Sequence, residues 1–304
     1  MSKLILLNLI LITSLTSYGQ TDTTITDTSF KINSDTISIQ SNSATSSFTD
    51  SRYGNNSDEE IYKLKPAVDI PVTLVGAGFS TYAFSKIYSK DKSTQVQIDN
   101  LRIDDINGFD RWAADIYSKS AATTSDLFFY GSMPYPLILL ADKHIRKDAA
   151  KIGFLYIEAM SITGLLYTGS TYLTDRYRPL AYNPEAGDER FGGGAKNSFI
   201  AGHPALVATS TFFTAKVFAD YHPESKLRHL FYGVAIAGTG ATAYLRHRGG
   251  KHFPSDILVG TAVGTLSGLL VPHFHKNQVI KKKGLSILPF VGEEVNGFSV
   301  VYKF

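Results

Sequence analysis

The chain has 304 residues, of which 43% are hydrophobic and 19% charged, so it can form one large globular domain or two small ones. Its net charge of +3 is too small to indicate nucleic-acid binding, and no nucleic-acid partner is expected. It contains no cysteine, which excludes disulfides, cysteine nucleophiles and thiolate metal sites.

The N-terminus has the pattern of a secretory signal peptide. Lys3 precedes an apolar run over residues 4–15, and the small residues Ser17 and Gly19 stand just before Gln20. The run is shorter than the ~20 residues that a membrane span needs, so an uncleaved anchor is the weaker alternative. The sequence therefore predicts a signal peptide over residues 1–19 and export to the cell envelope.

Residues 20–60 are rich in Ser, Thr and Asp and contain few large apolar side chains. Such a segment cannot bury enough surface to offset the entropy of ordering it. We therefore expect a disordered tether before the folded domain.

Six apolar segments follow, and none shows the strict alternation of a strand; they cover residues 68–84, 127–140, 152–173, 199–219, 230–245 and 256–272. Small residues such as Gly260, Gly264 and Gly268 would let helices approach closely. We therefore predict an all-α bundle of about six core helices over residues 61–283.

Evidence for a membrane-embedded bundle is divided. Several segments approach the length of a span, and basic clusters lie on the side opposite the motifs described below, which would put those motifs outside the cytoplasm. Glu158 and Lys216, however, stand inside apolar segments. After cleavage of a signal peptide, the mature chain would start outside the cytoplasm. Six membrane crossings would then put the motifs inside the cytoplasm, against the basic clusters, unless residues 68–84 do not cross. We expect an integral membrane protein with a periplasmic site; the alternative is a soluble periplasmic protein.

The last segment, residues 284–304, changes character. Alternating apolar runs flank Asn296-Gly297, a strong hairpin signal. The sequence predicts a C-terminal β-hairpin that packs on the domain.

Three short stretches carry the residues suited to phosphate chemistry: Arg178-Pro179, Gly202-His203, and Arg246 followed by His252 and Asp256. Arginine binds oxyanions with a planar fork of donors and stays charged. Asp256 lies one helical turn after His252 and can reach back to hydrogen-bond to its ring. A helix cap made by Asp256 or Ser255 is the alternative explanation of that spacing.

The order and spacing of these stretches resemble the type 2 phosphatidic acid phosphatase superfamily, which includes bacterial acid phosphatases and vanadium haloperoxidases. The resemblance covers about residues 127–273 and implies an acid phosphatase/haloperoxidase-like helical bundle. It implies that His252 is the nucleophile that accepts the phosphoryl group, with Asp256 holding its ring, and that His203 is the general acid. The implied phosphate ligands are Arg178, Arg246 and the backbone N–H of Gly202.

Several family residues are missing. Thr171 stands where the first motif has lysine, Ala201 and Leu245 replace two serines, and Ile200 replaces a proline. Thr171 can donate one hydrogen bond but brings no charge. Four cations in the motif loops are candidates to compensate: Arg176, Lys196, Arg248 and Lys251.

The resemblance implies a metal-independent phosphatase acting on a phosphate monoester or pyrophosphate, either a phosphorylated lipid or a small phosphate ester. The alternatives are a broad-specificity secreted acid phosphatase, a vanadium haloperoxidase, or an inactive envelope protein. We expect no cofactor, apart from vanadate in the haloperoxidase case. We expect no metal site, because His144, His222, His229, His273 and His275 show no ligand spacing joined to carboxylates, although His273 and His275 could bind a metal adventitiously.

Overall fold

The computed structural model describes residues 60–277, together with the backbone of residues 285–291 and 296–302. The predicted signal peptide and the tether up to residue 59 lie outside the described residues.

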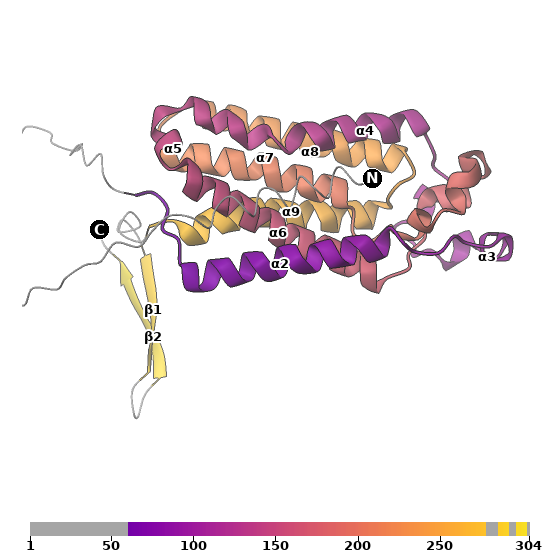
Figure 1. The fold of residues 1–304 in the computed structure, drawn as a ribbon, viewed down its shortest axis with the longest axis horizontal. Helices are drawn as coiled ribbons and strands as arrows, with labels where there is room; N and C mark the ends of the chain where they lie inside the picture. The colour runs from indigo at the N-terminus through magenta and orange to yellow at the C-terminus, as the bar shows by residue number, and fades with distance from the viewer. Residues whose placement is uncertain (1–59, 278–284, 292–295, 303–304) are drawn as a thin grey trace, which may run out of the picture. The chain divides into compact units, whose positions relative to one another are not determined.

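Six long helices lie side by side along one direction (Figure 1). They are α2 (Pro66–Ile87), α4 (Lys119–Ser132), α6 (Ala149–Leu173), α7 (Gly202–Tyr221), α8 (Leu227–Arg248) and α9 (Pro254–His275). Helix α7 packs against α4, α6, α8 and α9, and most of its side chains are buried. Residues 60–277 contain no strand, so the prediction of an all-α bundle of about six core helices is confirmed for this part of the chain.

Short helices fill the connections. They are α3 (Gln95–Asp99), α5 (Lys143–Lys147) and the 3₁₀ segments Ile103–Asp105, Arg111–Ala113, Tyr135–Ala141, Pro179–Tyr182, Pro184–Arg190 and Gly193–Lys196. Two of these segments begin at a proline, which suits the first helical position because proline has a fixed φ and lacks an N–H donor. The loop between α6 and α7 is thereby folded back onto the end of the bundle.

Glycines set the close packing of α9 on α7. A Cβ on Gly260, Gly264 or Gly268 would overlap the carbonyl oxygens of Ala201, Ala205 and Thr209, which follow one another at about one-turn spacing from the N-cap of α7 onward. Only glycine permits this backbone approach. The glycines of α8 differ, because a Cβ on Gly233, Gly238 or Gly240 would meet nothing within 4 Å. The predicted close approach of helices at Gly260, Gly264 and Gly268 is thus confirmed, whereas the glycines of α8 make no such contact.

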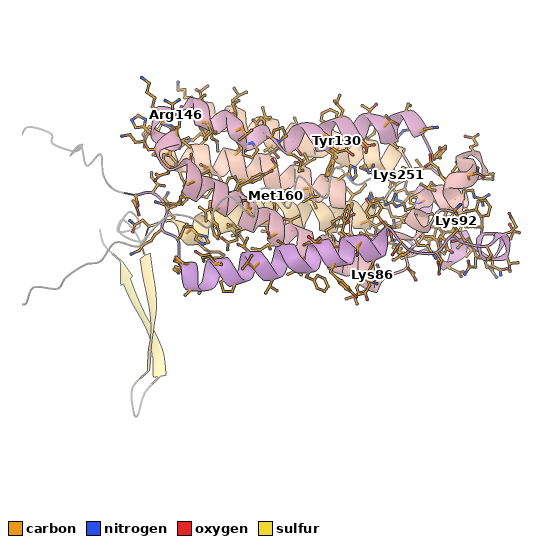
Figure 2. The ribbon with its side chains drawn as sticks, viewed as in Figure 1. Lys86, Lys92, Tyr130, Arg146, Met160 and Lys251 are labelled. Atoms are coloured by element: carbon orange, nitrogen blue, oxygen red, sulfur yellow. The ribbon has the colours of Figure 1, made fainter. Side chains whose placement is uncertain are left out.

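The helices share two common ends. Gly76 of α2 lies against Ser161 of α6, and Gly164 of α6 lies against Ser80 of α2, so these two helices run in the same direction. At one end, which we call the site end, α2, α6 and α8 finish while α4, α7 and α9 begin. We call the opposite end the far end. Figure 2 shows Lys92 and Lys251 toward the site end and Arg146 at the far end.

Three helices, α2, α6 and α9, are long and apolar enough to cross a membrane. Helix α2 exposes large apolar side chains along its length, among them Val68, Leu74, Val75 and Tyr82. Because α2 lies parallel to α6, it crosses wherever α6 does. If the bundle is embedded, residues 68–84 therefore cross with the other helices. The predicted export signal and the basic far end then favour opposite orientations.

Two strands follow the helical domain, and each is described only in its backbone. Strand β1 (Leu285–Val291) pairs antiparallel with β2 (Asn296–Tyr302), with Leu285 opposite Tyr302. Asn296 and Gly297 lie within β2, whereas the sequence placed them between the strands. The C-terminal β-hairpin, and its packing on the domain, stay predictions.

Candidate active site

His252 lies in the loop between α8 and α9 and is 2% exposed. Its Nδ1 lies 2.6 Å from the backbone oxygen of Ser198. A carbonyl oxygen only accepts hydrogen bonds, so Nδ1 carries the proton and Nε2 keeps a free lone pair. Burial, followed by the charges of Arg178 and Arg246, lowers the pKa of His252 well below its ordinary value. The imidazole is therefore neutral near pH 7 and has a nucleophilic nitrogen available.

Asp256 does not hydrogen-bond to His252 as the sequence predicted. Its Oδ2 accepts hydrogen bonds from the Ser198 hydroxyl at 2.6 Å and from the Phe253 backbone N–H at 2.9 Å. Its Oδ1 lies 2.5 Å from Nη1 of Arg176. The carboxylate caps the first turn of α9, the alternative explanation of the spacing. It supports His252 only through Ser198, whose hydroxyl it holds and whose carbonyl holds the ring.

His203 lies in the first turn of α7 and pairs with Asp126 of α4. Nε2 of His203 is 3.0 Å from Oδ1 of Asp126, an acceptor, so Nε2 carries the proton and Nδ1 is the atom that can gain one. Burial lowers the pKa of His203 to about 4, although the hydrogen bond to Asp126 raises it and Arg246 lowers it further. A bound phosphate would add negative charge and favour the protonated ring.

Arg246 and Arg178 supply fixed positive charge. Arg246 is 5% exposed; its Nη1 donates to Ser125 at 3.2 Å and to Asp126 at 3.3 Å, while its Nε is buried without a hydrogen-bond partner. Arg178 donates from Nε and Nη2 to the carbonyl of Asn197. The charges of both arginines lower the pKa of both histidines, which places the four groups in one site.

Gly202 begins α7 beside the two histidines. A Cβ at this position would lie 2.6 Å from the ring of Tyr167 on α6, so a side chain cannot be accommodated without moving that ring. The helix N-terminus also directs unpaired N–H groups and a partial positive charge toward an anion. The second predicted stretch therefore offers backbone donors where a phosphate would need them.

Comparison with family models finds a match for part of the chain. Residues 152–280 match the model described as PAP2 superfamily, a range that contains Arg178, Gly202, His203, Arg246 and the His252–Asp256 pair. Over these residues the chain is similar to the PAP2 superfamily. Searches of curated proteins and of solved structures find no match.

The position of the missing PAP2 lysine is closed to a phosphate. Thr171 is fully buried, and its hydroxyl lies 2.9 Å from the Tyr167 carbonyl and 3.0 Å from the Phe199 carbonyl. Lys90, from beyond the end of α2, donates to the carbonyls of Thr171 and Thr174 at 2.9 and 2.7 Å. This lysine supports the end of α6 rather than the phosphate position.

The four candidate compensating cations have different surroundings. Arg176 is committed to Asp110 and Asp256, at 2.6 and 2.5 Å. Lys196 lines a separate hollow near Lys90, and Arg248 is exposed to solvent. Arg176 reaches Asp256 of the site, but its charge is balanced by the two carboxylates that it contacts. No contact of Lys196 or Arg248 places either residue in the site.

Lys251, the fourth candidate, immediately precedes the candidate nucleophile. Burial lowers its pKa, its hydrogen bond to Glu189 at 2.7 Å raises it, and the charges of Arg178 and Arg246 lower it again. It therefore lies within electrostatic range of both PAP2 arginines. Of the four candidates, it is the one that can add a third positive charge to the site.

Two site carboxylates, Asp110 and Asp126, were missed from the sequence. Asp110 is fully buried and accepts hydrogen bonds from Arg176, Asn107 and the Ser255 backbone N–H. Burial alone would raise its pKa, but hydrogen bonds from Ser255 and Asn107 lower it. Neither residue belongs to a PAP2 stretch, and no local spacing marks them.

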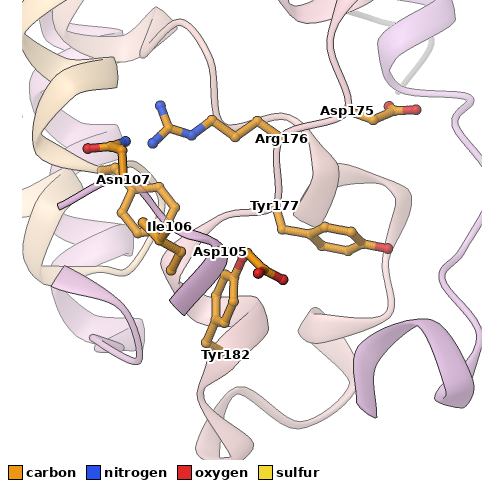
Figure 3. A pocket seen from close by; sticks show the side chains of 8 residues that line it. Asp105, Ile106, Asn107, Asp175, Arg176, Tyr177 and Tyr182 are labelled. Carbon is orange, nitrogen blue, oxygen red and sulfur yellow. The ribbon is translucent and has the colours of Figure 1, made fainter. Parts of the chain in front are cut away.

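A pocket of about 380 Å³ opens behind this network, lined by Asp105, Ile106, Asn107, Asp175, Arg176, Tyr177, Tyr182 and Phe253. Figure 3 shows Asp175, Arg176 and Tyr177 along one loop, with the Arg176 side chain directed away from that of Asp175. The histidines and Arg178 and Arg246 do not line this pocket, so it is not the phosphate position.

Proposed function

We propose that this protein is a phosphatase that hydrolyses a phosphate monoester or pyrophosphate of a lipid through a phosphohistidine on His252. The observation that carries this proposal is the pairing of a neutral, buried His252, whose Nε2 is free, with Arg246, whose Nε is buried without a partner. A buried orphan donor beside a free nucleophile fits an anionic substrate.

In the first step, Nε2 of His252 attacks phosphorus and a P–N bond forms. The bond between phosphorus and the leaving oxygen breaks, and His203, protonated on Nδ1, gives its proton to that oxygen. The imidazolium that develops on His252 is stabilised by the Ser198 carbonyl, which the Asp256–Ser198 hydrogen bond holds in place.

In the second step, water attacks the phosphohistidine and gives a proton to Nδ1 of His203. The P–N bond breaks, phosphate leaves, and both rings return to their starting states. Asp126 fixes the tautomer of His203 in both directions. These steps use no metal ion or cofactor.

Positive charge around the phosphoryl oxygens comes from Arg178, Arg246 and Lys251, with the N–H of Gly202 as a neutral donor. A phosphoryl-transfer transition state spreads charge over the equatorial oxygens, so positioned cations are the main source of catalysis. In this proposal Lys251 supplies the charge of the motif lysine. It comes from the loop between α8 and α9, whereas the motif position, Thr171, lies near the end of α6.

The arrangement of apolar helices supports a lipid substrate. The three helices that could cross a membrane all have one end at the site: α2 and α6 finish there, and α9 begins two residues after His252. A membrane around them would hold the site at its surface, where a lipid headgroup lies. We propose that this surface faces the periplasm.

The test is phosphate release by purified full-length protein from a lipid phosphate and from a small aryl phosphate, with His252→Ala as the matched variant. We expect faster release from the lipid, complete loss in the variant, and inhibition by vanadate. Equal rates on both substrates would favour a broad-specificity acid phosphatase. No release from either by folded protein would refute the proposal.

A further inference from the structure

Three ionisable side chains meet at the far end of the bundle, away from the phosphate chemistry. They are Asp69 of α2, Glu158 of α6 and His275 of α9, which are 3%, 5% and 8% exposed. One ligand atom from each lies within 4.8 Å of the others. The sequence did not reveal this set because its members are far apart in the chain.

The distances fit ligands around one small cation. Nε2 of His275 lies 3.1 Å from Oδ2 of Asp69 and 3.6 Å from Oε2 of Glu158. Two ligands held at 2.0–2.1 Å by a tetrahedral Zn²⁺ would stand about 3.3 Å apart. The separation of 3.6 Å is too long for a hydrogen bond but suits a shared metal ion.

His275 presents the nitrogen that a metal would use. Its Nδ1 lies 2.8 Å from the carbonyl oxygen of Val271, so this nitrogen carries the proton and Nε2 has a free lone pair. Metal-bound histidines usually donate their other ring N–H in this way, which fixes the ring orientation.

Glu158 gives a second, independent indication of a ligand. Its Oε2 is buried and makes no hydrogen bond, although it sits inside a helix that is apolar enough to cross a membrane. Thr73 and Glu158 stand three residues before the contacting pair Gly76 and Ser161, and the hydroxyl of Thr73 is also buried without a partner. Unpaired polar atoms of this kind are costly unless something binds them.

We propose that Asp69, Glu158 and His275 bind a divalent transition-metal ion, with Zn²⁺ the best fit. An imidazole with two carboxylates suits Zn²⁺ better than Ca²⁺ or Mg²⁺, which prefer six or more oxygen ligands. A dication balances both carboxylates, whereas an imidazolium would leave one buried negative charge unbalanced. The ion would fasten three helices together at the end where the chain enters and leaves the domain.

This metal site is separate from the proposed phosphatase. Helix α9 carries Asp256 at one end and His275 at the other, and its 22 residues extend about 33 Å. The metal therefore acts on stability and not on the reaction, and its test does not depend on phosphate release.

The experiment measures zinc bound to full-length protein that has been stripped with EDTA, reloaded with Zn²⁺ and desalted. We expect one zinc per chain in the wild type and in His229→Gln, an exposed control on α8, and only background zinc in His275→Gln and Glu158→Gln. A second measurement needs only the wild type: Zn²⁺ should raise the unfolding temperature of the stripped protein. This measurement tests the proposal even if a variant fails to fold.

Absence of zinc from the reloaded wild type would overturn the proposal, as would zinc retained in both variants. Stabilisation of the stripped wild type by lowering the pH, with no effect of Zn²⁺, would likewise overturn it by showing that a proton takes the place of the metal.

Discussion

His252 and His203 are held by the same kind of contact for opposite tasks. Each ring donates from one nitrogen to an oxygen acceptor, the Ser198 carbonyl or the Asp126 carboxylate, and keeps the other nitrogen free. A neutral carbonyl supports a nucleophile that must stay unprotonated, while a carboxylate supports a ring that must take up a proton. The residue-scale predictions test this division of roles.

Lys251 is predicted to be the third cation of the site. Lys251→Met should lower kcat/KM about 100-fold, because one donor to the developing charge is lost. Arg248→Met, which removes an exposed cation three residues earlier, should leave kcat/KM unchanged. Steady-state kinetics on one substrate compare kcat/KM of both variants with that of the wild type. A loss below about threefold in Lys251→Met would remove Lys251 from the mechanism.

Asp126 is predicted to set the pH dependence through His203. The protonated ring is the acid, and its pKa is about 4 in the free protein, so kcat/KM should fall as the pH rises above that value. Asp126 raises this pKa, so Asp126→Asn should lower it and move the falling limb to lower pH. Lowering the pKa of His203 by one pH unit should reduce kcat/KM about tenfold at any pH above the limb.

The pH profile of kcat/KM for the wild type and Asp126→Asn gives this result directly. A uniform loss of activity with the limb unmoved would show that Asp126 acts on Arg246 alone.

Local spacing explains which site residues the sequence revealed. Arg246, His252, Gly202 and His203 belong to short stretches whose spacing is itself the signal. Asp126 and Asp110 reach the site from another helix and a connecting loop, so only the fold brings them in. The sequence identified Asp256 as a site residue but predicted the wrong hydrogen-bond partner. The carboxylate oxygens of Asp256 bind Arg176 and Ser198 instead of His252.

At the scale of elements, backbone contact between α7 and α9 positions the two active-site turns. His203 begins α7 and His252 precedes α9, and the Ala201 N–H donates to the Asp256 carbonyl at 3.1 Å between them. The glycine row of α9 fixes the separation of these helices. The length of the apolar segments predicts that they are helices. It does not predict which glycines lie at a helix contact, because that depends on which neighbouring helix packs against each face.

Gly264→Ala should therefore destabilise the domain by about 1–3 kcal/mol, because the added methyl group overlaps the Ala205 carbonyl. Gly238→Ala, in open space on α8, should leave stability unchanged or raise it by up to ~1 kcal/mol through helix propensity. Thermal unfolding of both variants under identical conditions measures the difference. Equal unfolding temperatures would contradict the close α7–α9 contact.

At the scale of the whole molecule, the direction of α2 bears on the orientation of an embedded bundle. With this direction, the predicted export signal and the basic clusters at the far end favour opposite orientations. An exported start would put the far end outside, whereas the basic far end favours the cytoplasm. We predict that the site end is outside. The chain has no cysteine, so single cysteines can report on each end.

In intact spheroplasts, a membrane-impermeant maleimide should label Arg248→Cys at the site end and leave Lys226→Cys, between α7 and α8, unlabelled until the membrane is opened. The reverse pattern would contradict the proposed orientation. Labelling of both positions would show that the bundle is not embedded.

The central claim is the covalent intermediate, and the most direct measurement is phosphate trapped on the protein. Wild type and His203→Gln are mixed briefly with a labelled aryl phosphate and denatured in base, which preserves a phosphohistidine. We predict acid-labile label on the peptide that contains His252 and none in His252→Gln. More label is expected in His203→Gln, because an aryl leaving group needs little protonation and the loss of His203 then slows mainly the second step. Phosphate release without such label, or label that persists in His252→Gln, would contradict the account.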